Sequence, residues 1–145
     1  MSKKMKIILG ALIIIVIGAV SVLLYINKSH PSYEKLKAEF TVTPKAIYEE
    51  FKANSKATGL KYNGKMIELN GVISKVEASD SLVTVVFAFS QGLFGDEGVR
   101  CAMLSKFNKS TKVFKEGDNI DLKGLCQGFN ETDVIFEKCS LIKKQ

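Results

Sequence analysis

The side chains best suited to recognise a ligand are a few aromatic residues close to the single arginine of the chain. Phe87 and Phe89 alternate within residues 82–89 (L-V-T-V-V-F-A-F), and Arg100 follows them. Aromatic rings beside a cation are what a single-stranded nucleic acid requires, because bases stack on the rings and phosphates approach the cation. The same alternation is more often that of a strand that buries one face, which favours a place in the core for these rings.

A second group of apolar side chains lies where a surface loop is expected. Leu93 and Phe94 are flanked by glycines in residues 90–98 (S-Q-G-L-F-G-D-E-G). Because loop tips normally avoid large apolar side chains, this pair predicts docking to a partner or to a bilayer surface, or a loop that plugs one end of the domain. Phe129, in a later turn, has the same two interpretations. The predicted binding residues are Phe87, Phe89, Leu93, Phe94, Arg100 and Phe129.

Catalytic chemistry has little support in the sequence. The only histidine, His30, has no nucleophile placed near it by a motif, and neither C-x-x-C, H-E-x-x-H nor a phosphate-binding glycine loop occurs. Asp96 and Glu97 are adjacent in a glycine-rich stretch, where they predict solubility better than an acid and base pair. We therefore expect no enzyme activity, no cofactor and no metal site.

Three cysteines fall on three different predicted strands. They are Cys101, Cys126 and Cys139. Antiparallel pairing about a turn at residues 129–132 would place Cys126 opposite roughly Ile135, and a disulfide needs close Cα atoms. Buried reduced thiols, one disulfide, and a metal or catalytic role all remain open.

Residues 7–26 form 20 consecutive residues without a charge, preceded by Lys3, Lys4 and Lys6. At ~1.5 Å rise per residue, a helix of this length matches a hydrocarbon core of about 30 Å, and the lysines predict a cytoplasmic amino terminus. We expect a single-pass protein of the inner (cytoplasmic) membrane with an extracytoplasmic C-terminal domain. A cleaved signal peptide and a reversed topology are the alternatives. Beyond residue 26 the chain has 18 basic and 15 acidic side chains, so its net charge gives little support to a nucleic-acid surface.

The remaining elements can be placed by periodicity and by turn residues. Thr43 and Pro44 predict the cap and first residue of one helix that ends near Gly59. In segment 61–77, Ile67 and Leu69 alternate with Glu68 and Asn70, which predicts a strand with one buried face, bent at Gly71 where the apolar positions change parity. Four more strands are predicted over residues 82–89, 99–104, 119–126 and 134–142. The predicted organisation is a tail (1–6), a transmembrane helix (7–26), a tether (27–40) and a domain (41–145).

This order predicts an all-β domain with one N-terminal helix, a five-stranded OB-fold barrel behind a single transmembrane helix. Several short motifs carry a resemblance that covers about 100 residues. They are Tyr48, Phe51, Asn54, Ala57, Lys61-Tyr62-x-Gly64-Lys65-x-Ile67, Gly71-Val72, Val99-x-Cys101, Gly117-Asp118, Lys123-Gly124-x-Cys126-x-Gly128 and Cys139-x-Leu141. In these the chain resembles the tRNA_anti-like family of bacterial OB-fold proteins. The resemblance implies small envelope proteins, often with an amino-terminal membrane segment, and no established activity.

Two functions from different classes follow from these observations. The first is a non-catalytic binding module for an envelope protein, peptide or glycan, which sets nucleic acid aside as a partner. The alternative is a single-stranded nucleic-acid-binding OB-fold protein, which would use the same face.

Overall fold

The computed structural model describes residues 3–26, 32–108 and 113–144, and the chain divides into two units at residue 31. The first unit contains one helix, α1 (Lys3–Ile26). The side chains of Lys3, Lys4 and Lys6, and the whole of His30, lie outside the described part of the chain. Their predicted roles therefore have no structural counterpart here.

The structure corrects the membrane predictions. A span needs about 20 consecutive apolar residues in one helix. No helix among the described residues is long and apolar enough to cross a membrane. We therefore withdraw the transmembrane helix over residues 7–26, the membrane as a partner, and the single-pass location in the inner membrane with an extracytoplasmic domain.

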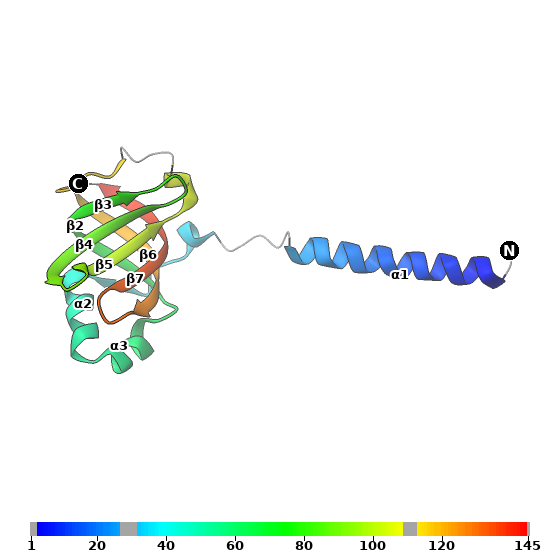
Figure 1. The fold of residues 1–145 in the computed structure, drawn as a ribbon, viewed down its shortest axis with the longest axis horizontal. Coiled ribbons are helices and arrows are strands. Elements are labelled where there is room, and N and C mark those ends of the chain that lie inside the picture. The colour runs from blue at the N-terminus through cyan, green and yellow to red at the C-terminus, as the bar shows by residue number, and fades with distance from the viewer. Residues whose placement is uncertain (1–2, 27–31, 109–112, 145) are drawn as a thin grey trace. The chain divides into compact units, whose positions relative to one another are not determined.

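The second unit is built on one seven-stranded sheet (Figure 1). Its strands are β1 (Phe40–Val42), β2 (Met66–Val72), β3 (Lys75–Ala78), β4 (Val83–Gly92), β5 (Gly95–Met103), β6 (Asn119–Phe129) and β7 (Val134–Lys144). Their order in the sheet is β1-β2-β6-β7-β5-β4-β3. The pairs β1–β2 and β5–β7 are parallel, and the other pairs are antiparallel. The predicted mostly β domain is confirmed.

Two residues between β2 and β3 connect opposite ends of this strand order. The backbone N–H of Ile73 donates to Asp118 O, just before β6, at 2.9 Å, and that of Ser74 donates to Val86 O of β4 at 2.9 Å. Two adjacent residues thus bond to β4 and to the residue before β6, which are not neighbours in the strand order, so the sheet curls on itself. The predicted change of parity at Gly71 is wrong. Ile67, Leu69 and Ile73 are all buried, so the burial pattern keeps the same parity past Gly71 and changes only after Ile73, between β2 and β3.

The structure has two helices where one was predicted, because the chain leaves the helical conformation at Asn54. α2 (Pro44–Ala53) ends at Asn54, and the Asn54 side chain caps α3 (Ser55–Tyr62) by accepting from Ala57 N at 3.0 Å. The predicted start is confirmed: Thr43 Oγ1 accepts from Ala46 N at 3.2 Å, and Pro44 opens the helix. With α1, the described residues contain three α-helices instead of a single N-terminal helix. Short 3-10 turns occur at η1 (Tyr33–Lys35) and η2 (Ser105–Phe107).

The core lies between the curled sheet and α2. Ile47, Tyr48 and Phe51 of α2 pack with inward residues of the strands, among them Phe87 and Phe136. All three cysteines are buried and free in the structure, so none forms the disulfide considered above. Burial raises the pKa of the Cys126 thiol to about 11 and raises that of Cys139 well above its ordinary range.

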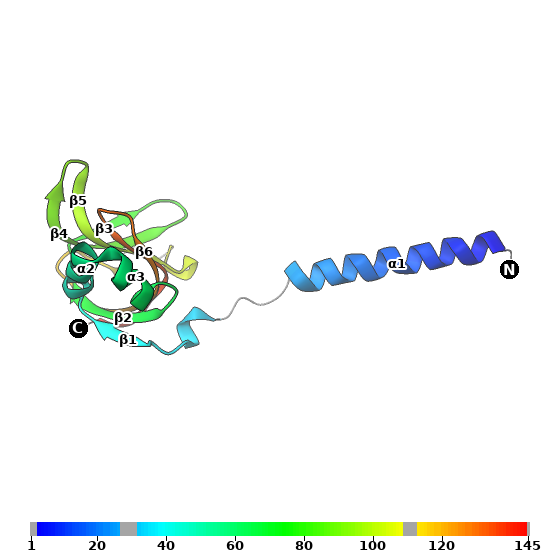
Figure 2. The ribbon, with the colours of Figure 1, turned by 90° about the horizontal axis from the view of Figure 1, so that it is seen from below.

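The predicted glycine-rich loop over residues 90–98 is mostly strand. β4 runs to Gly92 and β5 begins at Gly95, so only Leu93 and Phe94 remain between them. Figure 2 shows this hairpin projecting beyond the rest of the sheet. The two residues therefore lie at the tip of a protruding β-hairpin.

Candidate functional site

The pocket beside Phe89 is formed by three elements that meet at one end of the sheet. It has a volume of about 380 Å³ and an apolar lining. Its lining residues are Thr43, Pro44, Lys45, Asn70, Gly71, Val72, Phe87 and Phe89. We call this the Phe89 pocket. Its size falls in the range of small-molecule sites, which are typically concave, mostly apolar and bordered by a few polar groups.

The two phenylalanines of β4 contribute to the Phe89 pocket in different ways. Phe87 is 1% exposed and belongs to the core, whereas Phe89 is 38% exposed. The pairing of β4 with β5 shifts register between Ala88 and Ser90, which is where the strand leaves the core. Only the ring of Phe89 is therefore available to a ligand without movement of the core.

Gly71 allows Pro44 and Phe87 to pack close to β2 at the Phe89 pocket. A Cβ at position 71 would lie 2.9 Å from Pro44 Cγ and 3.3 Å from Phe87 Cε1. Contacts this short force a neighbour to move. The glycine thus serves close packing of α2 and β4 against β2, in place of the predicted bulge.

A polar network supports the Phe89 ring from the side of α2. Tyr48 lies 5.7 Å from Phe89 between ring centroids, and Lys52 Nζ lies 5.4 Å from the Tyr48 ring centroid. The Tyr48 hydroxyl donates to Glu97 Oε2 at 3.2 Å, and the Ser90 hydroxyl donates to the same oxygen at 3.0 Å. The hydrogen bond from Ser90, with smaller contributions from Tyr48 and Lys52, lowers the pKa of Glu97. The base of the hairpin is thus fixed to α2.

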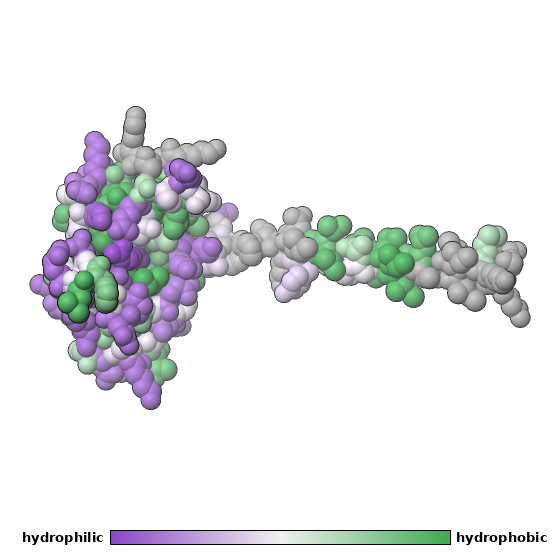
Figure 3. All heavy atoms as spheres, in the orientation of Figure 1, coloured by the Kyte–Doolittle hydropathy of each residue, from purple (hydrophilic) through white to green (hydrophobic). Residues whose placement is uncertain are grey.

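Leu93 and Phe94 are almost fully exposed at the hairpin tip. Their exposed fractions are 97% and 98%. In Figure 3 a hydrophobic patch stands out at the end of the hairpin against a largely hydrophilic surface. The structure therefore excludes the interpretation in which these side chains plug the sheet, and leaves them accessible.

Arg100 is held by two carboxylates. Its Nε donates to Asp133 Oδ2 at 3.0 Å, and its Nη1 donates to Glu77 Oε2 at 2.8 Å. Asp133 is 7% exposed and also accepts from Gly98 N at 2.9 Å. Burial alone would raise the pKa of Glu77, but hydrogen bonds from Arg100 and Lys75 outweigh it and lower that pKa. Arg100 therefore joins β3, β5 and the β6–β7 turn, which leaves its guanidinium less free for a phosphate.

Phe129 lies at the end of β6 and packs against α2. Its ring stacks on Phe51 at 5.8 Å and meets Tyr48 edge-on at 6.4 Å. It is half-buried, as a residue of the core boundary. Of the six predicted binding residues, the structure brings Phe87 and Phe89 together in one pocket and places Leu93 and Phe94 on the same hairpin. It gives Arg100 and Phe129 packing roles elsewhere.

Lys45 and Asn70 are pocket residues that sequence reasoning missed. Thr43-Pro44-Lys45 indicated only a helix start, and Asn70 appeared as the outward residue of a strand. They become neighbours because α2 begins against the end of β2, a contact that no local pattern encodes. In the described residues no group of three or more His, Cys, Asp and Glu side chains could hold a metal ion.

Comparison with solved structures shows a shared fold. A Klebsiella pneumoniae protein described as a candidate nucleic acid-binding lipoprotein superposes with a TM-score of 0.56 and 16% identity, over 71% of this chain and 91% of that chain. The mitochondrial single-stranded DNA-binding protein Rim1 of S. cerevisiae matches 57% of this chain and 99% of its own, with 13% identity and a TM-score of 0.37. Aspartyl tRNA synthetase from Entamoeba histolytica matches 82% of this chain and 24% of its own, with 9% identity and a TM-score of 0.45.

One of these neighbours contradicts the partner prediction made from the sequence. That prediction favoured an envelope protein, peptide or glycan and set nucleic acid aside, whereas the Klebsiella pneumoniae protein that shares the fold is described as a candidate nucleic acid-binding lipoprotein. We therefore withdraw it. No curated protein matches the chain. The tRNA_anti-like family matches residues 1–141, and the chain belongs to that family, as its motifs predicted.

Proposed function

We propose that residues 32–145 bind single-stranded nucleic acid, with one base stacked on Phe89. The observation that carries this proposal is a half-exposed aromatic ring in an apolar pocket that has a lysine in its lining. Sequence-tolerant binding of single strands depends on such rings, and each stacked base contributes about 1–3 kcal/mol. We further infer that the curled sheet is the predicted OB barrel, with β2 and β3 as the two halves of its first strand.

Two lysines of α2 supply the charge that this mode needs. Lys45 lines the Phe89 pocket, and Lys52 lies over Tyr48, whose ring contacts Phe89. Each also approaches a carboxylate, at 3.9 Å for Lys45 with Glu49 and 3.6 Å for Lys52 with Glu97. The Lys45–Glu49 pair is exposed and therefore weak, and the Lys52 side chain stays 49% exposed although Glu97 is only 19% exposed, so a phosphate can approach both ammonium groups.

The hairpin tip offers a second ring on the same strand pair. β4 continues for three residues from Phe89 to Gly92 before the two-residue turn that holds Phe94, so at about 3.3 Å per residue the two positions are separated by roughly 10–13 Å along the hairpin. An extended single strand can reach from one ring to the other. Support from known proteins is the shared fold with the Klebsiella pneumoniae protein described as a candidate nucleic acid-binding lipoprotein.

The net charge of the domain sets the expected salt dependence. Residues 32–145 contain 17 basic and 15 acidic side chains, so no large positive field is present. Counterion release gives a slope of about −0.7 per neutralised phosphate for single strands, so two lysine contacts predict a slope of about −1.4 for log K against log salt. We also propose that this role is non-catalytic; its support is the lack of a catalytic motif in the sequence.

The test is fluorescence anisotropy of labelled single strands with the full chain and matched variants. Phe89→Leu should weaken binding by about tenfold through loss of stacking. Lys45→Gln should lower the salt slope by about 0.7, because one phosphate contact is lost. Tyr33→Leu and Lys56→Gln, a half-buried ring and an exposed helical lysine that do not line the pocket, serve as controls. The proposal fails if the wild-type chain shows no salt-sensitive binding, or if Phe89→Leu binds as tightly as Tyr33→Leu.

A further inference from the structure

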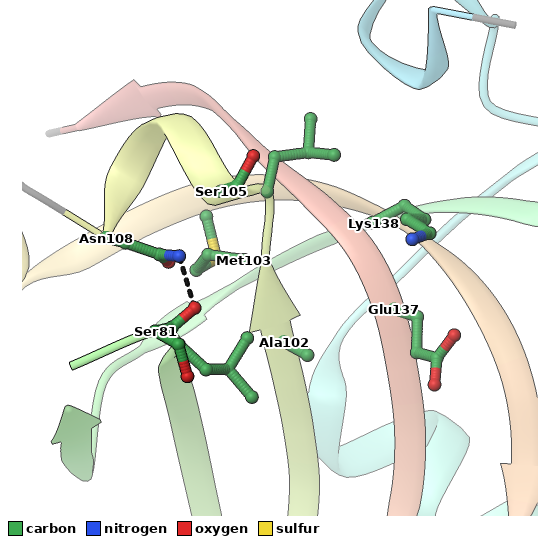
Figure 4. Close-up of a pocket in the computed structure, with 9 residues that line it drawn as sticks. Ser81, Ala102, Met103, Ser105, Asn108, Glu137 and Lys138 are labelled. Atoms are coloured by element: carbon green, nitrogen blue, oxygen red, sulfur yellow. Dashed lines mark hydrogen bonds between the residues drawn. The ribbon is translucent and has the colours of Figure 1, made fainter. Parts of the chain in front are cut away.

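A second pocket lies where the β3–β4 turn, the end of β5 and the middle of β7 meet (Figure 4). Its volume is about 340 Å³. The lining residues are Ser81, Leu82, Ala102, Met103, Leu104, Ser105, Asn108, Glu137 and Lys138. We call it the Ser81 pocket. None of these residues lines the Phe89 pocket, and none was predicted to bind a ligand.

The backbone at one wall of this pocket is irregular. The pairing of β5 with β7 goes from Cys101↔Phe136 to Met103↔Cys139, so β7 carries one extra residue, and Lys138 adopts φ 54°. A left-handed conformation is costly for a lysine, and bulges of this kind often re-aim side chains next to sites. Here the irregularity places Glu137 and Lys138 together in the lining of the pocket.

The opposite wall contains an acceptor without a partner. The Asn108 amide nitrogen donates to Ser81 O, which joins η2 to the β3–β4 turn. In the described part of the chain, Asn108 Oδ1 is a buried side-chain oxygen that receives no hydrogen bond. Buried polar atoms are nearly always paired, so this oxygen is an unused acceptor on a residue that lines the pocket. Because the oxygen is buried in the structure, a ligand can reach it only when the Asn108 side chain rotates.

The other polar groups of the pocket add acceptors and one cation. Glu137 Oε2 accepts from Gln127 Nε2 at 3.1 Å, and a carboxylate retains further lone pairs after one such bond. Leu82, Ala102 and Met103 supply the apolar part of the lining, with Leu82 the more exposed of the two larger side chains. Lys138 is exposed at the rim, where it can approach a phosphate. Acceptors around an apolar slot fit a ring that carries an amino group.

We propose that the Ser81 pocket binds a nucleobase with an exocyclic amino group, in preference to uracil or thymine. The inference rests on the proposed nucleic-acid binding and deepens it by naming the class of base. Carboxylate and amide oxygens accept from the amino group of cytosine, whereas the corresponding position of uracil is itself an acceptor. At the position of the amino group, uracil would place an oxygen against the Glu137 and Asn108 oxygens instead of a donor.

The experiment compares oligo(dC) with oligo(dU) of equal length at mildly alkaline pH, where cytosine is not protonated. These strands have the same charge and ring size, so the comparison isolates the amino group. The full-length chain should bind oligo(dC) about fivefold more tightly, the effect expected of one hydrogen bond to an otherwise unpaired acceptor. Asn108→Ala and Glu137→Ala should each lower this ratio and leave oligo(dU) affinity unchanged. Asn63→Ala and Glu116→Ala, exposed residues outside the pocket, should retain it.

The possible outcomes separate the two proposals. Equal, salt-sensitive binding of both strands overturns the preference for amino-bearing bases and leaves nucleic-acid binding in place. A preference that survives in both Asn108→Ala and Glu137→Ala overturns the assignment to this pocket. Failure of the wild-type chain to bind either strand overturns the proposed function, and the base preference with it.

Discussion

Removing the carboxylate of Asp133 tests whether Arg100 stabilises the fold or serves a ligand. In Asp133→Ala, Gly98 N loses its acceptor, and Arg100 retains only Glu77 among its two carboxylates. A buried donor left unpaired costs about 1–3 kcal/mol, and a hydrogen bond to a charged group contributes about 1.5–3 kcal/mol. Because the Arg100 side chain is 27% exposed, water offsets part of the second loss. We expect the free energy of unfolding to fall by about 3 kcal/mol.

Two further variants divide this loss into its parts. Asp133→Asn keeps an oxygen that can accept from Gly98 N and removes the charge, so we expect a loss of about 1–2 kcal/mol. Glu39→Gln is the matched control: it breaks the exposed Lys65–Glu39 ion pair, whose side chains are 44% and 49% exposed. Such pairs contribute about 0–1 kcal/mol.

The assay is urea unfolding of the full chain, followed by circular dichroism and intrinsic fluorescence. With a slope near 1.5 kcal/mol/M, the midpoint of Asp133→Ala should fall by about 2 M. A shift no larger than that of Glu39→Gln would refute the stabilising role of this pair. Arg100→Gln should likewise destabilise the fold and retain nucleic-acid affinity; a large loss of affinity in the folded variant would return Arg100 to the ligand site.

Two other predictions follow from titrating groups. Arg100 and Lys75 lower the pKa of Glu77 below its ordinary 4.5, so its stabilising contribution is present above about pH 4.5 and is lost as pH falls through the lower folded value. The wild-type protein should therefore begin to unfold at a higher pH, on acidification, than the rest of the chain alone would predict. Glu77→Gln should lose less stability than wild type below pH 4.5. Urea unfolding midpoints measured at several pH values would show this difference. The buried thiols, with the pKa of Cys126 raised to about 11, should react with a thiol reagent only after unfolding, and rapid reaction of native protein would contradict this.

Local signals in the sequence were sufficient for several elements. A threonine before a proline predicted the cap and first residue of α2, and both are as predicted. Alternation of Ile67 and Leu69 predicted their burial. These cases depend on contacts within a few residues, which periodicity and capping preferences record directly.

The candidate site depended on contacts that the sequence does not record. Phe87 and Phe89 have the same parity, and only the register shift of β4 makes one buried and the other accessible. Gly71 was recognised as special for the wrong reason, since its neighbour is Pro44, 27 positions earlier. The bulge that brings Lys138 to the second pocket lies within an ordinary strand pattern.

The position of β7 has a consequence for synthesis of the protein. Although β7 comes last among the strands of the described residues, it pairs with both β6 and β5 in the interior of the sheet. Until β7 is available, β5 and β6 therefore each keep an unpaired edge. Edges of this kind can pair with other chains, so prompt insertion of β7 between them protects the protein from aggregation.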